Sequence, residues 1–173
     1  MMLTAGSMDP LTPRPAPPHG EPPHEAPSRS GSLALDFDLP HPPAKVWRAL
    51  TDPALLAQWL LPVAGFRPEP GAAFTFQAPA YPGWDGTVDC EVVEVEPLRT
   101  LRYTWRVPFA DAALDTVVTF TLTPTGSGPT PSGTRLSIVQ AGFTPDQRRA
   151  LGGARYGWQR MGGTLAALLG RLP

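Results

Sequence analysis

Cysteine and histidine are scarce in this chain of 173 residues, and each scarcity excludes a kind of site. Cys90 is the only cysteine, so an internal disulfide is impossible and a reducing compartment is expected. Of the three histidines, His19 and His24 lie in a proline-rich N-terminal segment and His41 lies in a proline-rich turn. No Cys/His cluster has the spacing of a zinc site. We therefore predict no metal and no other cofactor.

An excess of one charge and long apolar runs are also missing. Fourteen basic and fifteen acidic residues give a net charge of −1, which argues against a nucleic-acid partner or an anionic membrane surface. No run reaches the roughly 18 apolar residues of a membrane span, and no basic region precedes an apolar stretch near the N-terminus. The expected location is the cytoplasm. Apolar residues make up 42% of the chain, which is enough for a core.

The first 32 residues differ in composition from the rest. They hold 8 of the 24 prolines and few bulky apolar side chains. Such a segment cannot bury enough surface to offset the entropy of ordering it. We predict a disordered, proline-rich tail at residues 1–32 and one folded domain at residues 33–173.

The folded part begins with a strand and two short helices. Residues 33–39 alternate between apolar and acidic side chains, which predicts a half-buried strand. Pro43 suits the first turn of a helix. Asp52 can cap a second helix that has Pro53 at its first position, and Pro62 ends that helix.

Strands follow, and a long helix closes the chain. Five strands are expected within residues 71–76, 86–97, 100–107, 116–123 and 134–140. The inward parity changes after Val92, which predicts a β-bulge there. Thr144 and Gln147 form a capping-box pattern, with Pro145 at the first helical position. An apolar stripe then runs through Leu151, Ala154, Trp158, Met161, Leu165, Leu168 and Leu172.

Glycines interrupt this last helix at positions 152, 153, 157, 162 and 163, among others. Each costs about 1 kcal/mol of helix stability relative to alanine. Packing on a sheet would compensate, because small residues let a helix and a sheet approach closely. The order of elements predicts an α+β fold in which a curved antiparallel sheet wraps around the C-terminal helix.

Several motifs together resemble a known superfamily. They are DLPHPPAKVWRALTDPALLAQW, DGTVDCEVVEVEPLRTLRYTW, GTRLSIVQAGF and RYGWQRMGGTLAALL. As a set they are similar to the START-like (SRPBCC) superfamily, and more narrowly to the branch named for the C-terminal domain of the heat-shock-chaperone ATPase activator. The resemblance covers about residues 33 to 172. It implies a helix-grip fold with a cavity between the sheet and the last helix, in a group of chaperone activators, lipid and polyketide binders, cyclases and many bacterial proteins.

The predicted ligand-binding residues are the inward aromatic, polar and apolar side chains around such a cavity. They are Trp47, Trp59, Phe76, Trp84, Tyr103, Trp105, Phe120, Gln140, Trp158, Met161 and Leu165. Trp84 lies in the turn of residues 81–86, which is interpreted as a hairpin at the cavity rim or as a mobile lid over it. Gln140 stands where many relatives carry a histidine, and glutamine cannot transfer a proton near neutral pH.

The favoured function is non-catalytic binding of a small hydrophobic molecule, lipid-like or polyketide-like. A second possibility is a protein-interaction module of the chaperone-activator type, with a chaperone or another protein as partner. A third is a cyclase-like or hydrolase-like enzyme that uses Tyr103, Gln140 or Arg155 with a bound water. No catalytic residue is predicted, because the sequence places no carboxylate or histidine on an inward position.

Overall fold

The computed structural model describes residues 31–80, 82–108 and 113–173. The elements in chain order are β1 (Gly31–Leu39), α1 (Pro43–Thr51), α2 (Pro53–Trp59), β2 (Val63–Ala64), β3 (Ala73–Gln77), β4 (Thr87–Glu96), β5 (Thr100–Val107), β6 (Leu114–Thr125), β7 (Gly133–Phe143) and α3 (Arg148–Arg171). The predicted tail lies outside the described residues, except that Gly31 and Ser32 begin β1 and pair with β7.

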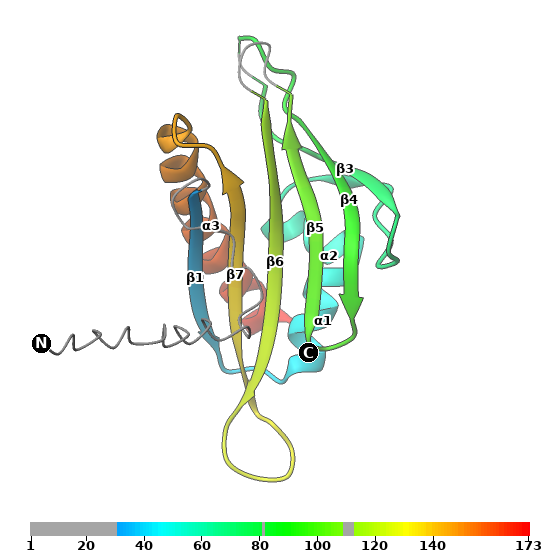
Figure 1. Ribbon diagram of the computed structural model, residues 1–173. Helices are drawn as coiled ribbons and strands as arrows, with labels where there is room; N and C mark the ends of the chain where they lie inside the picture. Colours follow the sequence, from blue (N-terminus) through cyan, green and yellow to red (C-terminus); the bar gives the residue numbers. More distant parts are fainter. Residues whose placement is uncertain (1–30, 81, 109–112) are drawn as a thin grey trace, which may run out of the picture.

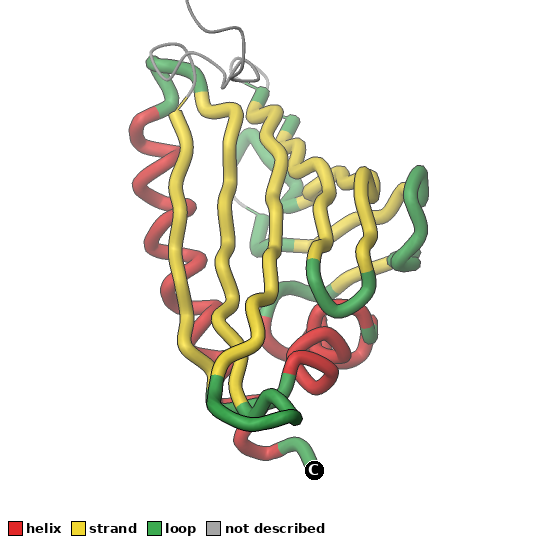
Figure 2. The backbone as a smooth tube through the Cα atoms, turned by 60° about the horizontal axis from the view of Figure 1, so that its bottom comes forward, coloured by secondary structure: helices red, strands yellow, loops and turns green. Residues whose placement is uncertain are grey.

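The strands form one antiparallel sheet in the order β1-β7-β6-β5-β4-β3-β2. The sheet curves around the helices, which lie together on one of its faces (Figures 1 and 2). α3 packs on β1 and β7, α1 packs on β6 and β7, and α2 contacts α3 and β2. This arrangement is the helix-grip α+β fold that the sequence predicts.

Alternation of side chains gives the sheet its two faces. Leu101 and Tyr103 of β5 are fully buried, whereas Arg106 of the same strand is exposed. The predicted bulge in β4 is confirmed, because its register against β5 shifts between Val92 and Glu94. The extra residue at this bulge turns the side chain after Val92 toward the outer face of the sheet, so the alternation of β4 changes parity there. The inward face is therefore continuous through β4 and β5.

The two short helices are joined by the predicted cap and by a tryptophan. Asp52 Oδ1 accepts a hydrogen bond of 2.9 Å from the Ala54 N–H, and α2 begins at Pro53. The buried Trp59 Nε1 donates to the carbonyl oxygen of Ala49 at 2.9 Å. This bond satisfies the indole N–H and fixes α2 against α1.

Two details differ from the sequence-based expectation. The strand β2 was not expected: at two residues it is too short to show alternation, and it pairs Val63 with Phe76. The sequence pattern predicts that α3 starts at Pro145, but the helix begins at Arg148. Thr144 and Gln147 keep one contact of the predicted capping box, because Gln147 Oε1 accepts from the Thr144 N–H at 2.9 Å. The Gln147 N–H donates to the Thr144 carbonyl at 2.9 Å and closes a turn before the helix.

No helix of the described residues is long and apolar enough to span a membrane.

Candidate ligand cavity

A cavity of about 280 Å³ lies between the sheet and the N-terminal half of α3. Its walls are almost entirely apolar. The lining residues are Leu61, Ala78, Pro79, Trp84, Val88, Trp105, Val107, Leu114, Gln140, Gly153, Ala154, Gly157, Trp158 and Met161. This volume lies just below the usual range of small-molecule sites, about 300–1,000 Å³.

Two glycines on the α3 side leave this space open. A Cβ atom built at Gly153 or Gly157 would meet nothing within 4 Å. Gly162 differs, because a Cβ there would overlap the Phe37 ring. The expected close approach of helix and sheet therefore occurs at Gly162, while Gly153 and Gly157 help to form the cavity.

One chain of hydrogen bonds crosses the buried side of the cavity. Trp158 Nε1 donates to Gln140 Oε1 at 2.8 Å, and Gln140 Nε2 donates to Thr116 Oγ1 at 2.9 Å. Thr116 Oγ1 in turn donates to the backbone carbonyl of Trp105 at 2.9 Å. An indole N–H can only donate and a carbonyl oxygen can only accept, so the direction of every bond is fixed. Gln140, 1% exposed, is therefore held in one amide orientation.

The turn that carries Trp84 is closed by its own hydrogen bonds. Trp84 Nε1 donates to the Thr87 carbonyl oxygen at 2.9 Å, and Gln77 Nε2 donates to the Asp85 carbonyl oxygen at 2.8 Å. Gly86 has a φ of +89° and lies against the Ala78 carbonyl. These contacts describe a hairpin at the cavity rim. Tyr81, at the start of the predicted turn, lies outside the described residues.

The predicted ligand-binding residues occupy three different places. Those in the cavity wall are Trp84, Trp105, Gln140, Trp158 and Met161. Those buried in the core without lining the cavity are Trp59, Phe76, Tyr103, Phe120 and Leu165. Trp47 is partly buried against the core, and Arg155 is exposed on α3 outside the wall.

Sequence reasoning missed the smaller apolar residues of the wall. Val88, Val107 and Leu114 share the inward parity of their strands, which was the available signal for them. Nothing in the sequence marked Ala78 or Pro79, because their place at the rim depends on how the loop after β3 folds back.

Of the described residues that line the cavity, none has an ionisable side chain. Two buried titratable side chains, Cys90 and Tyr103, lie in the core instead. Burial raises the pKa of the Cys90 thiol, and a smaller effect of Asp89 acts in the same direction. Burial also raises the pKa of Tyr103 well above its ordinary value, with a further contribution from Cys90. Both groups are therefore neutral at physiological pH.

Tyr103 Oη is a buried polar atom with no hydrogen-bond partner among the described residues. Its ring lies in an aromatic cluster, with ring centroids 5.1 Å from Phe74, 5.5 Å from Phe120 and 6.0 Å from Phe76. We interpret Tyr103 as a packing residue of the core.

Replacing Tyr103 by phenylalanine tests that interpretation. Removal of an unpaired buried hydroxyl should leave the free energy of unfolding unchanged or raise it by about 1 kcal/mol, because no hydrogen bond is lost and a desolvation cost disappears. Urea unfolding of both proteins measures the difference. A loss of more than about 1 kcal/mol would mean that the hydroxyl has a bonding partner in solution.

The contacts of His41 belong to the fold and not to the cavity. Its Nδ1 lies 3.2 Å from Lys45 Nζ, and its backbone carbonyl accepts a hydrogen bond of 2.8 Å from Thr134 Oγ1. Partial burial, and to a smaller extent Lys45, lower the pKa of the imidazole. No group of three or more His, Cys, Asp or Glu side chains that could hold a metal ion occurs in the part of the chain that the structure describes.

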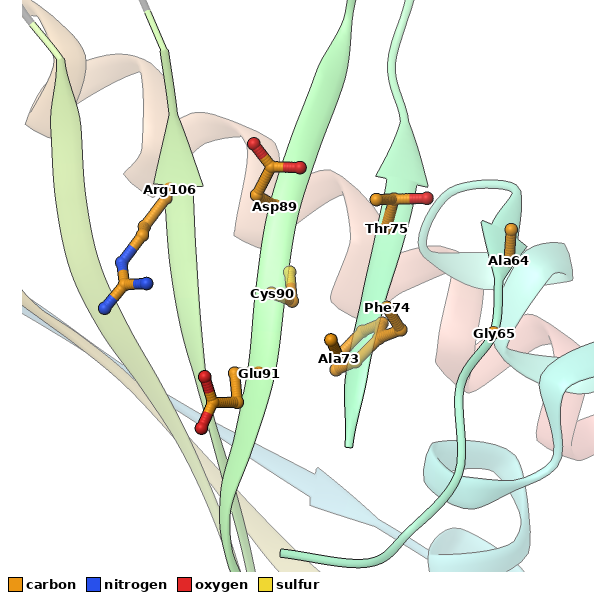
Figure 3. Close-up of a pocket in the computed structure, with 9 residues that line it drawn as sticks. All are labelled: Ala64, Gly65, Ala73, Phe74, Thr75, Asp89, Cys90, Glu91 and Arg106. Atoms are coloured by element: carbon orange, nitrogen blue, oxygen red, sulfur yellow. The ribbon is translucent and has the colours of Figure 1, made fainter. Parts of the chain in front are cut away.

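A larger hollow, about 520 Å³, lies on the face of the sheet turned away from α3 (Figure 3). Charged side chains from β4 and β5 border it, namely Asp89, Glu91 and Arg106. Arg106 forms an ion pair with Asp115 at 3.1 Å, and both side chains are more than half exposed. Exposed ion pairs of this kind contribute little to binding or stability. The inner cavity is the better candidate for a small apolar ligand, because three indole rings line it and no charged side chain of the described residues does.

Comparisons with known proteins agree with this fold. A family model described as "Activator of Hsp90 ATPase homolog 1-like protein" matches residues 40–170. The solved structure of protein MLL2253 from Mesorhizobium loti is 45% identical, with a TM-score of 0.74, over 83% of this chain and 99% of that one. Protein CV1439 from Chromobacterium violaceum is 31% identical, with a TM-score of 0.65, over 80% and 96%.

A third similar structure is DynU16, a protein of the dynemicin biosynthetic locus. It is 27% identical, with a TM-score of 0.63, over 81% of this chain and 47% of that one. No curated protein matches the chain.

Proposed function

The chain belongs to the Activator of Hsp90 ATPase homolog 1-like family, and we propose that it binds a small hydrophobic molecule in the cavity between its sheet and α3 without catalysing a reaction on it. The observation that carries the proposal is the composition of the wall. Three indole rings and aliphatic side chains surround one oriented amide. Apolar walls with few placed polar groups are typical of small-molecule sites.

The rings are arranged so that a flat molecule could contact two of them. The Trp105 and Trp158 ring centroids lie 5.5 Å apart with an interplanar angle of 58°. Such tilted aromatic pairs present both faces and edges to a neighbouring ring. DynU16, which is similar to this chain, comes from a biosynthetic locus, and that context suits a protein that handles small molecules.

Catalysis has less support from the side chains. A general acid or base must lie within hydrogen-bond reach of the reacting group and titrate near the working pH. Gln140 does not titrate, and Arg155 is exposed away from the wall. Tyr103, the remaining candidate of the enzyme hypothesis, is neutral and enclosed by aromatic rings.

A ligand screen followed by thermal unfolding tests the proposal. A molecule that fills the cavity binds the folded state alone, so at one hundred times its dissociation constant it should stabilise the protein by about 2.7 kcal/mol. It should also change tryptophan fluorescence, because three of the five tryptophans line the cavity. A screen of fatty acids, sterols, polyketides and smaller aromatic compounds that produced neither effect would contradict the proposal.

A protein-interaction role is the second candidate, favoured by the face of the sheet opposite α3. No helix of the described residues covers this face (Figure 1), and Val117, Thr119 and Val139 lie on it half-buried. The ATPase rate of a purified Hsp90-type chaperone distinguishes the two proposals. Addition of this protein should raise that ATPase rate if the interaction role is correct. It should leave the rate unchanged if the protein only binds a small molecule.

A further inference from the structure

The charge that a ligand carries should decide whether the cavity accepts it. The described residues of the wall include no arginine, lysine, histidine or carboxylate. The nearby charged side chains point elsewhere: Arg155 is exposed on α3, Arg106 lies on the opposite face of the sheet, and Asp85 lies in the exposed part of the rim turn. A charged group that entered the cavity would lose part of its water and find no counter-charge among the described residues of the wall.

Gln140 lines the cavity and has hydrogen-bonding capacity to spare. Its Nε2 carries two N–H groups, and the hydrogen bond to Thr116 uses one of them. Its Oε1 has two lone pairs, and the hydrogen bond from Trp158 uses one. The amide cannot rotate to exchange the two ends, because Trp158 offers only a donor and the Thr116 hydroxyl already donates to Trp105. The second N–H of Gln140 therefore keeps its character as a donor.

We propose that the cavity selects uncharged, flat molecules that place one oxygen, of a carbonyl or hydroxyl group, within hydrogen-bond distance of Gln140 Nε2, and that it rejects the corresponding carboxylates. This inference rests on the proposed function, since it assumes that the cavity is a ligand site. Burial of an ion without a partner costs far more than burial of a neutral oxygen that finds a donor. The discrimination applies to rigid molecules that fit within the cavity, because a long flexible chain could leave its charged end in water.

Three naphthalenes of similar shape separate the effect of a neutral oxygen on affinity from the effect of a charge. They are 2-acetylnaphthalene, which carries a neutral oxygen, 2-isopropylnaphthalene, which carries none, and 2-naphthoate, which is charged at pH 7. Calorimetric titration of the intact protein should give the lowest dissociation constant for the ketone. The hydrocarbon should bind about fivefold more weakly, the typical effect of one neutral hydrogen bond. The naphthoate should bind at least about a hundredfold more weakly than the ketone.

Replacement of Gln140 by methionine removes the donor at similar side-chain volume. The Gln140→Met variant should bind the ketone and the hydrocarbon with equal affinity and should still reject the naphthoate. The ligand series on the unaltered protein carries the test independently if this variant does not fold, because the change leaves Thr116 and Trp158 without their partner.

The outcomes separate this inference from the proposed function. If all three compounds bind to the unaltered protein with equal affinity, the cavity is a ligand site and the selectivity is wrong. A persistent preference for the ketone in Gln140→Met would also overturn the role of that residue. If neither the hydrocarbon nor the ketone binds, the inference is wrong, and the wider ligand screen then decides the proposed function separately.

Discussion

Replacement of Ala154 by phenylalanine should abolish ligand binding while the protein stays folded and stable. Ala154 lies in the cavity wall, on the half-buried side of α3. A benzyl side chain at this position would occupy the space otherwise available to a ligand. Because the new ring fills an existing cavity of about 280 Å³, the free energy of unfolding should stay within about 1 kcal/mol of the original or increase. The dissociation constant of 2-acetylnaphthalene should rise at least about a hundredfold.

A matched control is available on the same helix. Ala166 is exposed on α3 and does not line the cavity, so Ala166→Phe makes the same chemical change in contact with water. Its affinity for the ketone should stay within about twofold of the original. In a close-packed core, the ring at position 154 would instead cost about 1–3 kcal/mol through overpacking. Such a loss of stability, or ligand binding that survives in Ala154→Phe, would contradict the cavity.

A large loss of stability is expected from Gly86→Ala in the rim turn. Gly86 has a φ of +89°, which an L-amino acid adopts only with strain, and a Cβ atom there would overlap the backbone carbonyl of Ala78. The two chain segments that meet here are also joined by a hydrogen bond of 2.8 Å, from the Ala78 N–H to the Gly86 carbonyl. Backbone strain and overpacking together should lower the free energy of unfolding by about 2–5 kcal/mol. Urea unfolding measures the change.

Gly83 in the same turn separates the clash from the strain. It has a similar φ of +93°, but a Cβ atom there would meet nothing within 4 Å. Gly83→Ala should therefore show only the conformational cost, about 1–2 kcal/mol. Gly86→Ala should have the larger effect on stability, and it should also displace Trp84 and weaken ligand binding. Equal effects of the two substitutions would show that the contact with Ala78 does not hold the turn.

Much of the fold could be predicted from local patterns. Alternation fixed the inward face of β5 through Leu101 and Tyr103, and the change of parity after Val92 marked the bulge in β4. Asp52 and Pro53 marked the start of α2. These signals involve residues close together in the sequence. β2 and the first turn of α3 were harder, because both depend on which backbone groups meet in the folded chain.

The sequence indicated which face of the sheet borders the cavity, but not which residues along each strand line it. Tyr103 and Trp105 are two residues apart on the same inward face, yet only Trp105 lines the cavity. The difference depends on α3, where Gly153 and Gly157 leave space along the first turns and Leu165 fills the core further along. Parity alone cannot reveal which part of a strand faces those glycines.

The role of Gln140 shows the same limit. Its inward parity in β7 identified it as a candidate polar group. Its fixed orientation follows from Thr116 on β6 and Trp158 on α3. These partners are 24 and 18 residues away in the sequence, and their mutual positions exist only after the sheet and α3 have packed together.

The indole N–H signals of the five tryptophans provide the most direct test that the cavity is the ligand site. Trp84, Trp105 and Trp158 line the cavity, whereas Trp47 and Trp59 do not. In a two-dimensional nitrogen–proton NMR titration with 2-acetylnaphthalene, the largest shifts should occur for the first three, above all for Trp158, whose N–H bonds to Gln140. Largest shifts at Trp47 or Trp59, or no shift at saturating ligand, would contradict a ligand site between the sheet and α3.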